Sequence, residues 1–223
     1  MRVALAFFPG TNCDFDVERV IADVLREEIV RVNHKVTDLS EFDSIILPGG
    51  FSYGDYLRAG AIAAKMPIMN AIKRFAMSGK PVLGICNGFQ ILLEAKILPG
   101  ALIKNSSNRF VCKPVKVKVE RGDTAFTLLI EEGSVLRMPV AHAEGRYFVD
   151  EGTLRQIERK DMIVFRYIDN PNGSIANIAG ISNEEGNVVG LMPHPERASE
   201  KILGSDDGII MFKSMIEYVK RRL

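Results

Sequence analysis

The sequence predicts an α/β fold: a single domain over residues 1–223, with a largely parallel central sheet and helices on both of its faces. Short apolar runs alternate along the chain with amphipathic segments, a pattern typical of β-α-β units around a parallel sheet. The sequence has no internal repeat, low-complexity segment or Ser/Pro/Gly-rich linker at which it would divide. A chain of 223 residues is also long enough to bury one large core.

In the first half of the chain, strands and helices are expected in alternation. The strands are continuous apolar runs, as strands covered on both faces usually are. Their expected bounds are 3–8, 44–47 and 81–85. The first helix has Asp14 or Asp16 as its cap and apolar residues at helical spacing. The second begins at Pro67 and ends at Gly79, and a short helical segment covers residues 89–95.

The second half of the chain contains further strands and a final helix. Residues 113–119 alternate Lys with Val, which predicts a strand with one face in water. The other strand candidates are 133–140, 162–167, 174–181 and 188–192. The last helix is expected after a cap at Asp206 or Asp207, with apolar residues every four positions. These are Met211, Met215, Val219 and Leu223.

Charge and composition indicate neither a nucleic-acid partner nor a membrane. The formal net charge is +1, and hydrophobic and charged residues make up ordinary fractions, 47% and 26%. No run approaches the roughly 20 apolar residues of a membrane span, and the short N-terminal run is interpreted as a strand rather than a signal sequence. The three cysteines, Cys13, Cys86 and Cys112, have no metal-binding spacing. Their odd number argues against a disulfide framework and for a reducing, cytoplasmic location.

The main candidate for chemistry is Cys86, in the stretch Gly84-x-Cys86-x-Gly88. An apolar strand leads into this stretch and a helical segment follows, which is the arrangement of a nucleophile elbow. Such a turn needs small residues two before and two after the nucleophile, because the strand and helix come too close for side chains. The free N–H groups at the helix start favour a thiolate. The alternative is a buried structural cysteine in a glycine-rich turn.

A candidate base follows the last expected strand directly. A cysteine nucleophile needs a base, and the base needs an acceptor that orients it. Pro193 and Pro195 keep His194 in an extended conformation, in which residues two apart point to the same side. Glu196 is therefore expected beside His194, bonded to the ring nitrogen that does not face Cys86. The alternative is a structural histidine in a loop.

A third motif is the glycine pair Gly49-Gly50 at the end of the second expected strand. Exposed backbone N–H groups at such a turn can bind an oxyanion, together with the N–H of Asn87 after the nucleophile. An ordinary glycine turn is the alternative.

Together these motifs resemble the class I (triad-type) glutamine amidotransferases, which have a flavodoxin-like α/β fold. The order is the same: a Gly-Gly strand end, Gly-x-Cys-x-Gly-x-Gln, and a later His-Pro-Glu. Four further stretches resemble one member of that family, and the resemblance runs from residue 9 to about residue 197. These stretches are 9–14, 49–55, 141–147 and 170–174.

The resemblance implies a role for each motif. Cys86, His194 and Glu196 would form a catalytic triad. Gly50 and Asn87 would lend backbone N–H groups to an oxyanion hole. The glutamine pocket would be lined by Phe51, Gln90, His142, Ala143 and Glu144. No metal ligand is expected, and alanine at 143 departs from the glycine that the family pattern has there.

Partners are implied as well. The chain lacks the Gly-rich sequences of common nucleotide sites, so no cofactor is expected in it, and ammonia from L-glutamine has no acceptor on it. The resemblance implies a large synthetase subunit that uses ATP and Mg²⁺, and a small accessory subunit. The isolated chain is expected to hydrolyse glutamine poorly. Two alternatives stay open: a cysteine peptidase-like hydrolase with the same elbow, and a non-catalytic scaffold.

Four further residues carry weaker expectations. Cys13 is expected to be a small buried or partner-facing residue, and Cys112 a structural one. Arg109 and Phe110 form a polar-aromatic cluster that suggests an interface.

Overall fold

A nine-stranded mixed sheet forms the centre of the structure, a computed structural model that describes residues 1–222. Its strand order is β2-β1-β3-β4-β11-β10-β9-β6-β7. The strands are β1 (Arg2–Phe7), β2 (Glu28–Asn33), β3 (Ser44–Leu47), β4 (Val82–Ile85), β6 (Val111–Val119), β7 (Val135–His142), β9 (Ile163–Tyr167), β10 (Ile178–Ser182) and β11 (Val188–Leu191). Two short strands, β5 (Ala101–Ile103) and β8 (Arg146–Phe148), pair separately.

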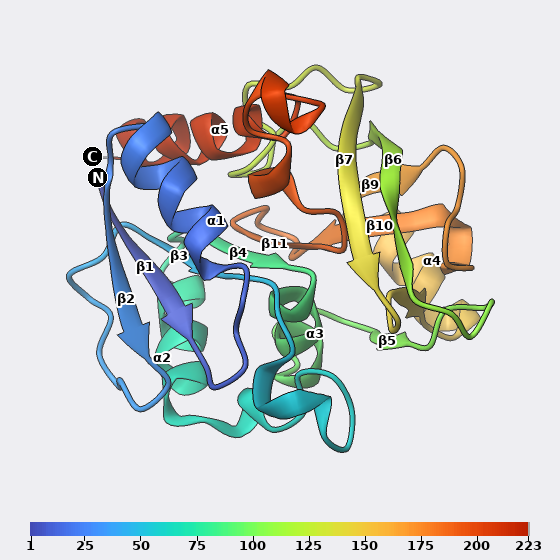
Figure 1. Cartoon of the computed structure of the whole chain (residues 1–223), viewed down its shortest axis with the longest axis horizontal. Helices are drawn as coiled ribbons and strands as arrows, with labels where there is room; N and C mark the ends of the chain where they lie inside the picture. The colour runs from blue at the N-terminus through green and yellow to red at the C-terminus, as the bar shows by residue number, and fades with distance from the viewer. Residues whose placement is uncertain (223) are drawn as a thin grey trace.

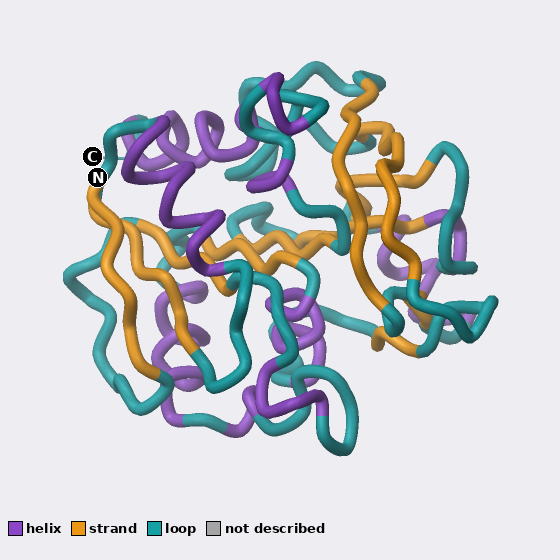
Figure 2. The backbone as a smooth tube through the Cα atoms, viewed as in Figure 1, coloured by secondary structure: helices purple, strands orange, loops and turns teal. Residues whose placement is uncertain are grey.

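Helices cover both faces of the parallel half of this sheet. On one face lie α1 (Asp14–Glu18), which continues as π-helical turns over Arg19–Val24, and α5 (Ile209–Lys220). On the other lie α2 (Pro67–Met77) and α3 (Asn87–Glu94), while α4 (Glu151–Arg159) packs beside the antiparallel strands (Figure 1). Figure 2 shows the strands as a continuous band with helices on either side. The predicted α/β fold is confirmed.

The pairing of neighbouring strands changes from parallel to antiparallel at β11. From β2 to β11 every neighbouring pair is parallel, and from β11 to β7 every pair is antiparallel. All residues of β3, β4 and β11 are buried, as their unbroken apolar runs predict for strands covered on both faces. In β6 buried and exposed residues alternate from Val115 to Val119, which confirms the predicted wet face of that strand.

Two expected helix caps are wrong. Cys13, not an aspartate, is the N-cap residue of α1, and Asp14 and Asp16 lie inside its first turn. Gly208 precedes α5 with no side-chain cap, because the carboxylate of Asp207 instead accepts the backbone N–H of Arg137 at 2.7 Å. Of the apolar residues expected on the last helix, Met211, Met215 and Val219 are buried. Leu223 lies outside the described residues.

Register places the carboxyl ends of β4 and β11 side by side. The two strands are parallel neighbours, with Gly84 opposite Gly190 and Ile85 opposite Leu191. Cys86 and the loop after Leu191 therefore leave the sheet at the same edge. β3 is the other neighbour of β4, so the turn at residues 49 and 50 leaves there too. None of the helices within residues 1–222 combines the length and apolar character that a bilayer span requires.

Candidate active site

Cys86 lies on a strained turn between β4 and α3. Its backbone has φ +50° and ψ −103°, a conformation that side chains other than glycine rarely adopt. A Cβ placed on Gly84 would lie 2.6 Å from the Leu92 side chain, and one on Gly88 would lie 2.0 Å from the carbonyl oxygen of Leu47. Both glycines are thus required by close packing of the helix on the sheet. The geometry is that of the predicted nucleophile elbow.

The thiol of Cys86 faces the antiparallel half of the sheet. Its backbone N–H donates to Leu191 O at 2.8 Å, which locks the turn to β11. Its Sγ lies 3.9 Å from the carbonyl oxygen of Ala141, near the end of β7. β7 therefore forms a wall of the site, and the adjacent Pro139 accepts the backbone N–H of His194 at 2.9 Å.

His194 and Glu196 are paired as the spacing predicts. His194 has an extended backbone (φ −105°, ψ 92°), and a single 3₁₀ turn follows it at Pro195–Arg197. The Nδ1 atom of His194 lies 2.6 Å from Oε1 of Glu196. Both side chains are buried, so the carboxylate and the imidazole depend on each other for solvation.

Opposing effects set the protonation of His194. Burial alone would lower the pKa of the imidazole. The charges of Glu196 and Cys86, together with the nearby thiols of Cys13 and Cys86, outweigh burial and raise the pKa of His194 well above its ordinary value. The site therefore favours an imidazolium ion, the form that can protonate a leaving amine.

The triad is assembled but not closed. Within residues 1–222, Nε2 of His194 and Oε2 of Glu196 are buried atoms without a hydrogen-bond partner. Cys86 is near enough for its charge to act on His194, yet no hydrogen bond of normal geometry joins the two in the described chain. Catalytic hydrogen bonds are often long before substrate binds. Both buried atoms are thus left without a partner in the resting site.

The glycine pair lies against this cluster. A Cβ on Gly49 would be 2.9 Å from Cε1 of His194, and Gly50 has φ +150°, which favours glycine. The backbone N–H of Ser52 donates to Oδ1 of Asn87 at 3.1 Å, tying the chain after the glycines to the residue after Cys86. Asn87 begins α3, where backbone N–H groups have no intrahelical acceptor. The two expected oxyanion donors therefore lie on segments that are bonded together.

Side-chain amides extend the site from Asn87 toward β8. Nδ2 of Asn87 donates to Oε1 of Gln90 at 2.9 Å, and Nε2 of Gln90 donates to Glu144 O at 2.7 Å. Gln90 and Glu144 are thus brought together as the resemblance implies. Ala143 is exposed nearby, and Phe51 is exposed with its N–H bonded to Gly10 O.

His142 differs from the other pocket candidates because its ring does not reach solvent. The side chain is 3% exposed, and its Nδ1 lies 3.1 Å from Oδ1 of Asn105. Burial and the charge of His194 lower the pKa of His142 to about 4, so the ring is neutral. Its ring also packs against Gly145, where a Cβ would come within 2.2 Å of it. His142 thus supports the backbone of the stretch 143–145 from behind.

Two residues at the site, Asn105 and Asp55, were not predicted as site residues from the sequence. Asn105 bonds His142 and also accepts the Gly145 N–H at 3.1 Å. Asp55 lies 3.5 Å from Nδ2 of Asn87, and burial with the charge of Glu144 raises the pKa of Asp55 to about 6. Of these, only Asp55 lies in a stretch that the sequence singled out.

Cys13 joins the catalytic cluster from α1. Its Sγ and the ligand atoms of His194 and Glu196 all lie within 4.8 Å of one another. Nη2 of Arg197 donates to this sulfur at 3.1 Å, and a guanidinium so close disfavours a bound cation. We therefore interpret the group as a hydrogen-bonded cluster. Cys112, in contrast, is exposed, as is Phe110.

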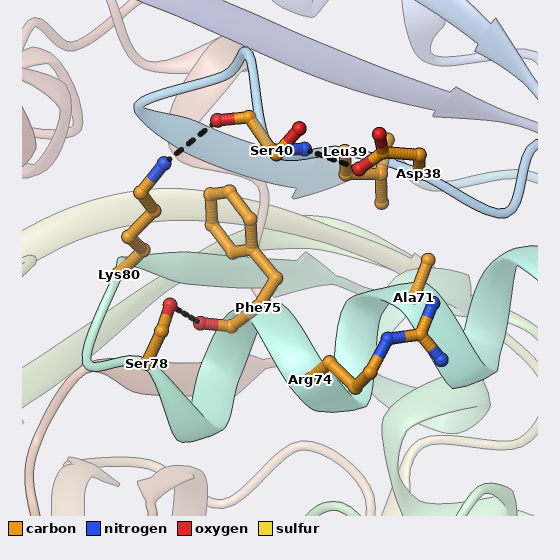
Figure 3. Close-up of a pocket in the computed structure, with 8 residues that line it drawn as sticks. All are labelled: Asp38, Leu39, Ser40, Ala71, Arg74, Phe75, Ser78 and Lys80. Carbon is orange, nitrogen blue, oxygen red and sulfur yellow. Dashed lines mark hydrogen bonds between the residues drawn. The ribbon is translucent and has the colours of Figure 1, made fainter.

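A hollow of about 250 Å³ lies away from this chemistry, between α2 and the segment before β3. Figure 3 shows its lining, with Lys80 bonded to Ser40 O at 3.1 Å and Ser78 bonded to Phe75 O at 2.7 Å. Arg74 also donates to Thr37 O at 2.7 Å, so the polar side chains of the hollow are largely engaged in bonds within the protein. We do not consider it a candidate site.

Comparison with known proteins agrees with the geometry. The family of CobB/CobQ-like glutamine amidotransferase domains matches residues 1–219. The chain belongs to this family. Two curated proteins from Methanosarcina barkeri and Methanosarcina acetivorans, both called phosphoribosylformylglycinamidine synthase subunit PurQ, are 54% and 52% identical to it. Each alignment covers 98% of both chains.

A solved structure gives the same result for the fold. A chain in the structure of PurLQS from Thermotoga maritima has a TM-score of 0.90 and 45% identity, with 98% of each chain covered. The expected amidotransferase fold is therefore confirmed over almost the whole length of both chains.

Proposed function

We propose that the chain is the glutaminase subunit of a phosphoribosylformylglycinamidine synthase. It hydrolyses L-glutamine to glutamate and ammonia, and a synthetase subunit uses the ammonia to make phosphoribosylformylglycinamidine in purine biosynthesis. Full-length identity of 54% to a subunit of that name supports this proposal. The four further stretches singled out in the sequence support the same member of the family.

One observation carries the chemistry. A cysteine on a strained elbow lies beside an imidazole whose Nδ1 is 2.6 Å from a buried carboxylate. A thiolate, a proton carrier and an orienting acceptor are the parts that nucleophilic catalysis needs. In this proposal Cys86, His194 and Glu196 are the catalytic triad.

The first half of the reaction forms a thioester. The Cys86 thiolate attacks the side-chain amide carbon of glutamine, and the carbonyl oxygen becomes an oxyanion held by the N–H groups of Gly50 and Asn87. As the oxyanion collapses, the C–N bond breaks and His194 gives its proton to the leaving ammonia. A γ-glutamyl thioester remains on Cys86.

The second half releases glutamate. His194, now neutral, removes a proton from a water molecule, and the resulting hydroxide attacks the thioester carbon. The C–S bond breaks, Cys86 leaves as a thiolate and His194 keeps the proton. Glu196 orients the imidazole in both halves and stabilises its charged form. Phe51, Gln90, Ala143 and Glu144 line the glutamine pocket, and His142 supports it.

The proposed partners are a large synthetase subunit and a small accessory subunit. The solved PurLQS structure of Thermotoga maritima supports an assembly of this kind. ATP and Mg²⁺ belong to the synthetase in this proposal, no cofactor to the present chain, and the complex works in the cytoplasm.

The proposal is tested with 6-diazo-5-oxo-norleucine, an electrophile that mimics glutamine. Mass spectrometry of the treated chain, alone and with its synthetase, is expected to find one adduct on Cys86 that excess glutamine prevents. A peptidase-like enzyme would ignore glutamine and cleave peptides, and a scaffold would form no protected adduct. Absence of the adduct in the complex would contradict the proposal.

A further inference from the structure

Cys13 contacts two segments beside the triad, the turn at Gly49 and the loop that carries His194. It is the N-cap residue of α1 and is 3% exposed. Its backbone N–H donates to Gly49 O at 3.1 Å, in the turn that carries the proposed oxyanion donor Gly50. One residue therefore links the first helix to the glycine pair.

The side chain of Cys13 contacts Arg197, the residue directly after Glu196. Nη2 of Arg197 donates to Sγ at 3.1 Å, and Nε donates to Oδ2 of Asp16 at 3.0 Å. The guanidinium thus bridges α1 and the loop that carries the base. Because both of its contacts are to α1, the position of this loop depends on the position of the helix.

The sulfur also abuts the catalytic imidazole. The position of a Cβ on Gly49 would be 2.9 Å from Cys13 Sγ and 2.9 Å from His194 Cε1, so the thiol and the ring approach each other across a residue without a side chain. Cys13 Sγ lies within 4.8 Å of a ring nitrogen of His194. Any larger residue at 49 would separate them or displace one. Glycine at position 49 therefore allows Cys13 and His194 to lie close together.

We infer that Cys13, held by Arg197, is a positioning residue for the proposed glutaminase reaction: its buried thiol fixes the His194 imidazole between Glu196 and Cys86. The inference rests on the proposed function and adds to it a second thiol that takes no part in bond making. Cys13 has no elbow and its sulfur is shielded by a guanidinium, so it holds the base while Cys86 reacts.

The ionisable groups near His194 come from several elements. Glu196 follows it in the same loop, and Arg197 comes next and is bonded to Cys13. Cys86 approaches from the elbow, Cys13 from α1, and His142 from β7. Burial lowers the pKa of the imidazole, whereas Glu196, Cys86 and Cys13 raise it. Removing the sulfur of Cys13 therefore lowers the pKa of His194, while the Glu196 pair stays in place.

The test compares Cys13→Val, which replaces the sulfur with methyl groups, with Cys13→Ser, which can still accept from Arg197. Cys112→Ser is the matched control, because that cysteine is exposed. For the complex with its synthetase we expect kcat for glutamine to fall about tenfold in Cys13→Val, with KM changed less than about twofold. Cys13→Ser is expected to recover part of the loss, and Cys112→Ser to behave as the wild type.

A second readout does not depend on turnover. The chain has three histidines, so imidazole signals in an NMR pH titration of the full chain are few, and the one lost in His194→Gln identifies the base. Its pKa is expected to be lower in Cys13→Val than in the wild type, and the alkaline limb of kcat to move to lower pH with it. Because the imidazolium is the active acid, activity disappears as pH rises through this pKa.

The two proposals fail in different ways. A wild-type complex that releases no ammonia from glutamine would overturn the proposed function, and the inference with it. If the wild type is active but Cys13→Val keeps both its kcat and its His194 titration, only the positioning role is wrong. If Cys13→Val does not fold, the same two measurements are made on Cys13→Ser. A Cys13→Ser protein with the kcat and the His194 pKa of the wild type would overturn the inference.

Discussion

Glu196 is the residue whose charge has the largest consequence for the site. Its carboxylate is buried and bonded to the imidazole, and its second oxygen has no hydrogen-bond partner among residues 1–222. A buried carboxylate is tolerated when it is paired. The pairing in turn raises the pKa of His194 above its ordinary range, against the effect of burial.

Replacement of this charge gives the first prediction. In Glu196→Gln the bond to Nδ1 keeps its shape, but the charge that favours the imidazolium is lost. We expect glutaminase activity to fall about 100-fold or more, and the remaining activity to disappear at lower pH than in the wild type. Steady-state rates across the pH range measure both effects. Glu184→Gln, at an exposed surface pair with Lys160, is the control, and an equal loss there would refute the assignment.

Asp55 leads to a second prediction, about stability. Burial and the charge of Glu144 raise the pKa of Asp55 to about 6 from its ordinary value of 3.8. A raised carboxyl pKa means that the folded state holds the proton more tightly than the unfolded state, so stability falls as pH rises through this interval. Because Asp55 is only half-buried, solvent screening reduces the effect to the order of 1 kcal/mol.

Asp55→Asn removes this pH dependence. Relative to the wild type, the variant is expected to gain more thermal stability near pH 7 than near pH 3, where Asp55 is largely protonated in both states. Thermal unfolding of the two proteins at both pH values measures the difference. A difference that does not change with pH would show that Asp55 carries no such penalty.

At the scale of elements, the elbow depends on how closely α3 approaches the sheet. Gly88→Ala would place a methyl group 2.0 Å from Leu47 O, a backbone atom that cannot move alone. We expect a loss of about 3 kcal/mol or more in the free energy of unfolding, measured by denaturant titration. Gly133→Ala is the control: its φ is +85° but its Cβ would meet nothing within 4 Å. Its cost is expected to be only the backbone strain of about 1 kcal/mol.

The elements that the sequence predicted best are those with a strong local pattern. The elbow follows from Gly84 and Gly88, and the His194–Glu196 pair from a spacing of two between prolines. β2, α4 and the pair β5–β8 were not expected, because β2 is a largely exposed edge strand, α4 buries one residue, and β5 and β8 have three residues each. The contact of Cys13 with the loop of His194 joins segments far apart in sequence, so no motif could predict it.

The predicted N-caps of α1 and α5 were wrong for a related reason. Aspartates near a helix start are good caps in isolation. Asp14 instead pairs with Arg31 at 2.8 Å, and Asp207 with the backbone of Arg137, both distant in sequence. Tertiary contacts therefore take the side chains that local rules assign to the helix. The prediction of a single domain over residues 1–223 stays a prediction.

At the scale of the whole molecule, the resting site is not closed. His194 Nε2 makes no hydrogen bond within the described chain, and Cys86 Sγ lies toward Ala141 instead. We expect the isolated chain to release ammonia from glutamine at least about tenfold more slowly than the complex with its synthetase, because closing this pair needs a small displacement. Ammonia release by the chain alone and by the complex measures this. Full activity of the pure chain would contradict it.

The pairing of β4 with β11 also has a consequence while the protein is being made. The two strands are neighbours in the sheet, yet Cys86 precedes His194 by more than a hundred residues. A nascent chain on the ribosome therefore carries the thiol without its imidazole until β11 has been synthesised, and pairing between such distant segments is slow. A chain stopped at residue 187 is expected to release no ammonia from glutamine, which an assay of that fragment tests. Translation order alone thus keeps an unfinished glutaminase from consuming the cell's glutamine.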